Sequence, residues 1–304
     1  MPRMHVDEVD IDDGLVRRLV DAQFPRWRDL PLEAVTSAGT VHALYRLGDD
    51  MVVRLPRRPA AVPQLEKEQD WLPRLAPHLP LPVPVPLARG RPTEDYPNAW
   101  AVVRWLEGET ADRAPLNDPF EAARALGEFI RALHAVDATG GPEAGAITGG
   151  RGAPLALRDA SIRGRLDDLR AGNFDVDIEA ATAAWDDALA APAWDGPPVW
   201  FHGDLLPGNL LLEDGRIAAV IDFGQIGVGD PACDLVPAWS VLPAEARDTF
   251  RGALDVDDAT WNRGRGWALF VGLSGLPYYH ETNPAFAALC RRMIEAVLAD
   301  PDWR

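Results

Sequence analysis

Three polar side chains in residues 201–224 have the types and the spacing for a magnesium-dependent reaction. Asp204 and Asn209 bracket a short polar loop, and Asp222 follows an apolar run. Amide and carboxylate oxygens are hard ligands of the kind that Mg²⁺ prefers in proteins. A carboxylate that binds no metal can instead accept a proton from a reacting hydroxyl group. The segment therefore offers two metal ligands, Asn209 and Asp222, and one candidate base, Asp204.

A predicted hairpin would position these side chains. Residues 210–213 and 216–221 are apolar runs typical of short strands, and an acidic residue and a glycine between them favour a tight turn. A hairpin brings the loop before its first strand close to the residue after its second strand. We therefore expect Asn209 and Asp222 to converge, with Asp204 close by.

The order of these motifs resembles the catalytic core of the kinase fold. The sequence H-G-D-L-L-P-G-N at residues 202–209 is similar to the catalytic loop H-R-D-x-x-x-x-N, and I-D-F-G at residues 221–224 is similar to the metal-binding D-F-G motif. The H-G-D form, and G-D-P-A-C-D-L at residues 229–235, look more like the aminoglycoside phosphotransferase family than like the protein kinases. The resemblance covers most of the chain, from residue 35 to residue 299.

This resemblance implies an α+β, protein-kinase-like fold with two lobes. Residues 1–106 would form a small, antiparallel-sheet, nucleotide-binding lobe, and residues 107–304 a mainly helical lobe that binds the substrate. The implied reaction is transfer of the γ-phosphoryl group of ATP or GTP to a hydroxyl group of a small molecule. Asp204 would accept the proton of that hydroxyl, while Asn209 and Asp222 would hold Mg²⁺.

The resemblance also assigns residues that contact the phosphates of the nucleotide. Arg54 takes the position at which protein kinases usually carry lysine, and it supplies a permanent charge on a planar fork. Glu68 is expected to pair with Arg54, and Glu66 to face solvent. The turn that would cover the phosphates contains a single glycine, Gly39, in place of the G-x-G-x-x-G of protein kinases.

Apolar residues are expected around the purine ring. Val53 and Val103 would sandwich the ring, and backbone groups of residues 104–106, which include Trp105 and Leu106, would face its edge.

The remaining elements follow from periodicity and from glycine and proline positions. A proline inside the helix at residues 62–76 is expected to kink or shorten it, and the proline-rich stretch at 80–86 to lead into an edge strand. Residues 278–281 are expected to form a loop. Helices are predicted at residues 9–28, 62–76, 119–136, 155–171, 176–191, 244–254, 259–276 and 284–299, and strands at 33–37, 41–47, 51–55, 83–88, 100–105 and 199–201.

Side chains near the catalytic motif have expected structural roles. His202 is predicted to support the loop by hydrogen bonding, and Asp234 to bind backbone groups near it. Asp230 could cap a helix or contact substrate. His134 is predicted to pack or to cap a helix.

The composition limits the possible partners and the compartment. The 304 residues carry a net charge of −17, which argues against nucleic acid or an anionic membrane as a partner and is compatible with a cationic substrate. No apolar run approaches the ~20 residues that span a bilayer, and the acidic N-terminus does not resemble a signal peptide. Cys233 and Cys290 are expected to be buried thiols. We therefore expect a cytoplasmic protein.

The acceptor does not follow from the motifs. Aminoglycosides give the family its name, but relatives of the fold phosphorylate macrolides, choline, homoserine and sugars. One alternative is therefore a metabolic kinase for another hydroxylated small molecule. Another is a nucleotide-binding module without catalysis, which Arg54 and the single glycine favour and the intact Asp204, Asn209 and Asp222 oppose. A protein kinase is disfavoured because no A-P-E motif follows the D-F-G.

Overall fold

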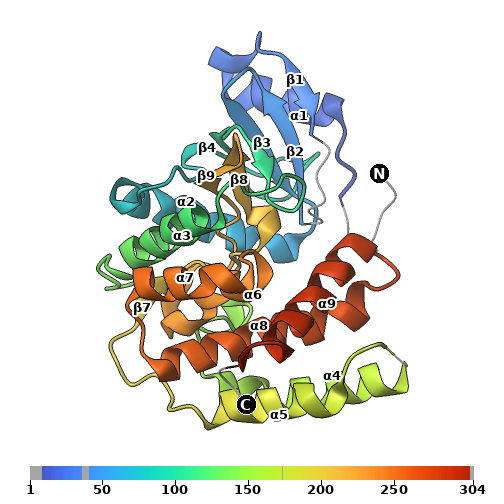
Figure 1. Cartoon of the computed structure of the whole chain (residues 1–304). Helices are drawn as coiled ribbons and strands as arrows, with labels where there is room; N and C mark the ends of the chain where they lie inside the picture. The colour runs from blue at the N-terminus through green and yellow to red at the C-terminus, as the bar shows by residue number, and fades with distance from the viewer. Residues whose placement is uncertain (1–8, 36–40, 173, 302–304) are drawn as a thin grey trace. The chain divides into compact units, whose positions relative to one another are not determined.

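The structure is a computed structural model that describes residues 9–35, 41–172 and 174–301. The chain divides into two compact units. The first consists of Met1–Glu107 and Ala219–Gly224, and the second of Gly108–Ala218 and Gln225–Arg304. The first contains an antiparallel sheet and the second is mainly helical (Figure 1), so the predicted α+β class is confirmed.

The sheet of the first unit has five antiparallel strands. Its order is β1-β2-β3-β5-β4, which places β4, the strand that begins at the end of the proline-rich stretch, at an edge as expected. An edge strand tolerates proline because one side of it needs no ladder hydrogen bonds. The strands are β1 (Leu32–Ala34), β2 (His42–Leu47), β3 (Met51–Pro56), β4 (Pro86–Gly90) and β5 (Trp100–Arg104).

The two faces of this sheet are covered by different helices. Helix α1 (Asp13–Gln23) buries its apolar stripe against one face. Helix α2 (Val62–Leu75) supplies Leu65 to the apolar cluster on the other face. Because successive residues of a strand point to opposite faces, Val53 packs on the α1 side, whereas its neighbour Val52 lies on the α2 side.

The proline inside α2 does not shorten the helix as predicted. Pro73 cannot donate to the carbonyl of Gln69, and that carbonyl instead accepts a hydrogen bond from Arg89 Nη2 at 2.7 Å. The helix therefore continues to Leu75.

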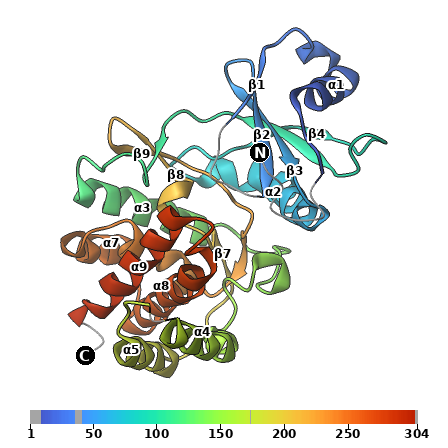
Figure 2. The same ribbon diagram turned by 90° about the vertical axis from the view of Figure 1, so that its right-hand side faces the viewer.

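The second unit packs around α8 (Asp258–Tyr279), which contacts α5 and lies beside α9 in both views (Figures 1 and 2). Tyr278 and Tyr279 belong to the last turn of α8, so the prediction that they form a loop was wrong. Pro277 removes one helical hydrogen bond, to the carbonyl of Leu273, yet the helix continues to Tyr279, whose ring packs against Phe286 at 4.9 Å between centroids. The other helices are α3 (Pro119–His134), α4 (Asp159–Ala171), α5 (Ile178–Ala190), α6 (Pro237–Ser240), α7 (Arg247–Leu254) and α9 (Pro284–Leu298).

Short strands frame the catalytic motif. The predicted hairpin of β8 (Leu210–Glu213) and β9 (Arg216–Val220) is confirmed. Its turn residues Asp214 and Gly215 both have positive φ angles, 48° and 71°, as tight two-residue hairpin turns require. The sequence did not predict β6 (Glu109–Thr110), which pairs with β8, or β10 (Gly227–Gly229), which pairs with β7 (Val199–Phe201).

None of the helices in the described ranges is long and apolar enough to cross a membrane.

Candidate functional site

The backbone of the predicted catalytic loop is held by a buried carboxylate. Asp234, with 0% of its surface exposed, accepts hydrogen bonds from the backbone N–H groups of His202, at 2.9 Å, and Gly203, at 2.7 Å. His134 Nε2 lies 3.4 Å from the same carboxylate. Gly203 has a φ of +79°, a conformation that favours glycine. The predicted role of Asp234 is confirmed, and the loop entering Asp204 has a fixed backbone.

Asp204 and Asn209 are joined directly by hydrogen bonds. Asn209 Nδ2 donates to the backbone carbonyl of Asp204 at 2.8 Å and to its Oδ2 at 3.0 Å. The Asp204 N–H donates to His202 Nδ1 at 3.2 Å, which confirms that His202 supports the loop. In the part of the chain that the structure describes, Asn209 Oδ1 accepts no hydrogen bond. That oxygen is therefore available to a metal ion.

Asp222 belongs to the first unit, where it follows β9 in a left-handed conformation. Its φ is 61°, and the residue is exposed. Among the residues that the structure describes, Oδ1 accepts one long hydrogen bond, of 3.4 Å, from Gly224 N. Asp and Asn tolerate the left-handed region better than other residues with a Cβ. The negative charge of Asp222 acts on Arg54 in the same unit.

Arg54 and Glu68 form a buried ion pair between β3 and α2, as predicted. Only 8% of Arg54 and 2% of Glu68 is exposed. Arg54 Nη1 contacts Glu68 Oε2, and Nη2 donates to Oε1 at 3.2 Å, so the pair is bidentate. Burial by itself lowers the pKa of Arg54, but Glu68 and then Asp222 outweigh it and the pKa is raised. Glu66 is exposed, as expected.

The residues predicted to sandwich the purine do not share a face of the sheet. The β3–β5 register pairs Val52 with Val103 and Val53 with Val102. Val103 accordingly belongs to the α2-side cluster, whereas Val53 is fully buried in the α1-side cluster. The structure thus separates Val53 from Val103 and brings Val52 beside Val103. Alternation within β3 predicts that Val52 and Val53 face opposite sides of the sheet, and the β3–β5 register decides which of them lies beside Val103.

Two of the three backbone N–H groups predicted to face the purine are already engaged. The Arg104 N–H donates to Val85 O at 3.1 Å, and that of Trp105 donates to Asp50 O at 2.8 Å. The N–H and carbonyl groups of Leu106 have no hydrogen-bond partner among residues 9–35, 41–172 and 174–301. Gly39 lies outside the described residues.

The sequence did not single out two cationic residues, one beside Glu68 and one beside Gly203. Lys67, the sole lysine of the chain, is 5% exposed and adjacent to Glu68; burial lowers its pKa to about 8. Because it is the sole lysine, the sequence could have marked Lys67 for attention. Arg151 donates from Nε to the carbonyl of Gly203 at 3.0 Å. No sequence signal pointed to it, because it lies in an irregular glycine-rich loop.

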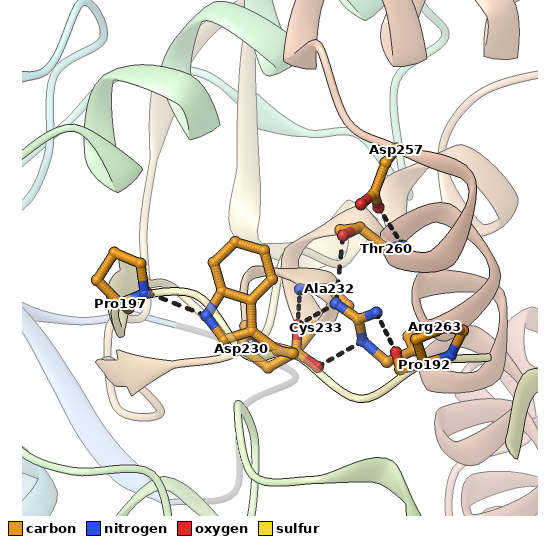
Figure 3. Close-up of polar contacts among 9 residues, drawn as sticks. Pro192, Pro197, Asp230, Ala232, Cys233, Asp257, Thr260 and Arg263 are labelled. Atoms are coloured by element: carbon orange, nitrogen blue, oxygen red, sulfur yellow. Dashed lines mark hydrogen bonds and ion pairs between the residues drawn. The ribbon is translucent and has the colours of Figure 1, made fainter.

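Asp230 is held in a structural network of the second unit (Figure 3). Its carboxylate receives Arg263 Nε at 2.8 Å and Nη2 at 3.1 Å, and the N–H of Ala232 at 3.0 Å. Arg263 also donates to the Pro192 carbonyl at 2.7 Å. The sequence left Asp230 open between capping and substrate contact. The structure shows that it caps the turn at Pro231–Leu235 and binds Arg263.

The chain matches a family model and several curated proteins. The sequence model of the "Phosphotransferase enzyme family" matches residues 35–267. An aminoglycoside 3'-phosphotransferase of Streptomyces fradiae is 30% identical over 202 residues, which cover 63% of this chain and 64% of that enzyme. An Escherichia coli aminoglycoside 3'-phosphotransferase is 29% identical over 212 residues, covering 66% of this chain and 73% of that enzyme. The chain thus spans less than two thirds of the S. fradiae relative's length.

Solved structures share the fold over nearly the whole chain. The GDP complex of wild-type aminoglycoside 2'-phosphotransferase-IIIa has a TM-score of 0.73 at 19% identity, covering 95% of this chain and 99% of that one. At that identity the likeness shows the fold alone. A macrolide 2'-phosphotransferase of Brachybacterium faecium, crystallised as apoenzyme, has a TM-score of 0.60 at 26% identity, covering 95% and 98% of the two chains.

Proposed function

The chain belongs to the phosphotransferase enzyme family, and we propose that it transfers the γ-phosphoryl group of ATP or GTP to a hydroxyl group of a small molecule. One observation carries this proposal. Asp204 and Asn209 are hydrogen-bonded to each other on a loop whose backbone Asp234 holds in place. Relatives named as aminoglycoside 3'-phosphotransferases make an aminoglycoside-type antibiotic the first candidate acceptor.

Asp204 is the proposed base. Its carboxylate would orient the acceptor hydroxyl and take its proton as the phosphoryl group is transferred. The hydrogen bond from Asn209 Nδ2 at 3.0 Å fixes one carboxylate oxygen and so orients the carboxylate. Because the loop is fixed before substrate binds, catalysis would draw on alignment and on electrostatic stabilisation of the transferring group.

Asn209 and Asp222 are the proposed ligands of Mg²⁺. Their oxygens fit a hard cation, since Asn209 Oδ1 accepts no hydrogen bond from the described part of the chain and the Asp222 carboxylate is exposed. Mg²⁺ characteristically uses one or two protein oxygens together with substrate phosphates and water. When bound, the ion would neutralise negative charge on the phosphates.

The nucleotide is assigned to residues 1–106, the proposed nucleotide-binding lobe, and the acceptor to residues 107–304. Arg54, oriented by Glu68, would neutralise phosphate charge. Val103, together with Val52 in place of Val53, would contact the purine face. The unpaired backbone of Leu106, next to Trp105, would face its polar edge. Gly39 remains the candidate residue for covering the phosphates.

Net charge favours an aminoglycoside but does not select it alone. A chain with 47 acidic and 30 basic residues attracts a polycation over long range. The macrolide phosphotransferase at 26% identity keeps a metabolic or other hydroxylated acceptor as an alternative. A nucleotide-binding module without catalysis would retain Arg54 and Glu68 and have no use for Asp204.

The test is nucleotide consumption by the purified protein with Mg²⁺ and ATP or GTP against aminoglycosides, macrolides, sugars and amino alcohols. We expect one acceptor class to stimulate turnover. Asp204→Asn, which keeps the side-chain shape, should lower kcat by about 10²-fold or more, whereas Glu213→Ala, on the exposed end of β8, should leave it unchanged. Turnover at the wild-type rate in Asp204→Asn would refute the assigned role.

A further inference from the structure

The Arg151 guanidinium is held against the catalytic loop by contacts that leave most of its donors unused. Nε donates to the Gly203 carbonyl at 3.0 Å, directly before Asp204. The Cζ atom lies 5.0 Å from the centroid of the Phe270 ring and 5.9 Å from that of Trp267, both on α8. The two Nη groups donate to no residue in the described ranges.

Arg158 presents a second guanidinium with even fewer partners. Its Nε is buried without a hydrogen bond, and none of its side-chain nitrogens donates to a described residue. The group lies flat over Gly150, since a Cβ added there would be 2.5 Å from Arg158 Cζ. Gly150 precedes Arg151 in the chain, and the positive charge of Arg158 acts on the Arg151 guanidinium, so the two cationic groups lie in the same region of the second unit.

The nearest acid in sequence does not neutralise Arg158. Asp159 Oδ1 instead accepts from Arg163 Nε at 3.0 Å and from Trp185 Nε1 at 2.9 Å. Burial lowers the pKa of Arg151; the Asp204 and Cys233 side chains act in the opposite direction, and the Arg158 charge lowers the pKa further. The two guanidinium groups thus have unpaired N–H donors, and one of them is partly desolvated. Their positive charge is not balanced by nearby acids.

We propose that Arg151 and Arg158 form a binding site for an oxyanion beside Asp204, and this inference rests on the proposed phosphotransferase function. The planar N–H forks of two arginines match phosphoryl and carboxylate oxygens. The oxyanion is either the phosphoryl group undergoing transfer or an acidic group on the acceptor. In the first case Arg151 stabilises the charge of the transition state. In the second, the acceptor is a hydroxylated acid.

Binding of inorganic phosphate, measured by titration calorimetry in a zwitterionic buffer, tests the site without requiring turnover. Arg151→Gln and Arg158→Gln should each weaken phosphate binding by about tenfold or more, the effect of losing charge-assisted hydrogen bonds. Arg170→Gln is the matched control, because Arg170 lies on α4, the helix that begins directly after Arg158, and is exposed and paired with Asp167. Phosphate that does not bind to the wild type, or that binds equally to all variants, would overturn the proposal.

Arg158→Gln keeps the test valid if Arg151→Gln does not fold, since the Arg158 side chain donates no hydrogen bond to any residue that the structure describes. Arg151→Lys adds a second check, because it retains the charge and loses the fork. It should bind phosphate more weakly than the wild type and more tightly than Arg151→Gln.

Kinetics distinguish the two sources of the oxyanion. If the phosphoryl group is bound, Arg151→Gln lowers both acceptor-independent nucleotide hydrolysis and kcat. If an acidic acceptor is bound, hydrolysis is unchanged and the KM of the acceptor rises, while a neutral analogue of that acceptor is unaffected. Unaltered hydrolysis, kcat and acceptor KM in an enzyme that turns over would overturn the site. Phosphate binding that depends on both arginines, in a protein without turnover, would instead refute the phosphotransferase function alone.

Discussion

Asp234 Oδ1 accepts the backbone N–H of Gly203 at 2.7 Å, although 31 residues separate the two in the chain. The other oxygen of the same carboxylate accepts the N–H of His202 at 2.9 Å. A fully buried acid of the segment after β10 therefore sets the backbone from which Asp204 projects.

Replacing Asp234 should destabilise the protein and its catalytic loop together. Asp234→Ala leaves two buried N–H groups without acceptors, at a cost of about 1–3 kcal/mol for each group. Asp234→Asn keeps one acceptor oxygen and should lose less. Urea unfolding followed by tryptophan fluorescence measures the change. An Asp234→Ala protein with the wild-type unfolding midpoint would show that these hydrogen bonds are not needed.

Substitutions of Arg54 and Glu68 should have strongly non-additive effects on the free energy of unfolding. Glu68→Ala leaves Arg54 buried without its partner, so we expect a loss of about 3–5 kcal/mol in the free energy of unfolding. The double variant Arg54→Met/Glu68→Met should recover much of this loss, because no uncompensated charge remains, yet it should still bind nucleotide poorly. Glu66→Ala is the control, with an expected change within about 0.5 kcal/mol for an exposed position. If the double variant lost as much stability as the sum of the losses in Arg54→Met and Glu68→Met, the pairing would be contradicted.

Lys67 should titrate far below an ordinary lysine. Burial favours its neutral form and lowers its pKa from 10.5 to about 8. The unfolded chain therefore binds more protons than the folded protein between these values, and this group makes stability rise as the pH rises from about 8 to about 10.5. Below pH 8 the buried charge is disfavoured in the folded state.

Selective ¹³C labelling of lysine gives one signal from the folded chain, because Lys67 is the sole lysine. Its chemical shift should change with a midpoint near pH 8 in the folded protein and near its ordinary value in urea. A folded-state midpoint near 10.5 would show that the ammonium group is hydrated. Lys67→Met should remove this contribution to the pH dependence of the unfolding free energy.

Asp230 and Arg263 should stabilise the protein as a pair, so that removing one of them costs more than its own contribution. Arg263→Met would leave the Asp230 carboxylate, which is 5% exposed, without its cationic partner. We expect the free energy of unfolding to fall by about 3–5 kcal/mol. Asp230→Asn keeps the N-terminal cap to Ala232 through the amide oxygen, so the loss should be smaller. Thermal unfolding of the two single variants and the double variant measures the coupling, and a coupling energy near zero would refute it.

The sequence determined the family and the order of most elements, and it predicted the residues of the proposed catalytic loop. These depend on local information: apolar alternation in β3, the tight turn of the β8–β9 hairpin, and motifs whose residues lie within a few positions of one another. Glu68 could be chosen over Glu66 because only one of them faces the strand that carries Arg54. The separation of Val53 from Val103 depends on the register between β3 and β5, which pairs Val103 with Val52.

Only the tertiary structure decided which distant groups satisfy one another. The Gln69 carbonyl, left free by Pro73, is bound by Arg89, so α2 continues. Asp230 is neutralised by Arg263, whereas the described part of the chain offers the guanidinium groups of Arg151 and Arg158 a single acceptor, the Gly203 carbonyl. The physical reason is that a buried polar group must find its partner wherever the fold brings one, and neither periodicity nor local propensity specifies contacts between residues far apart in the chain.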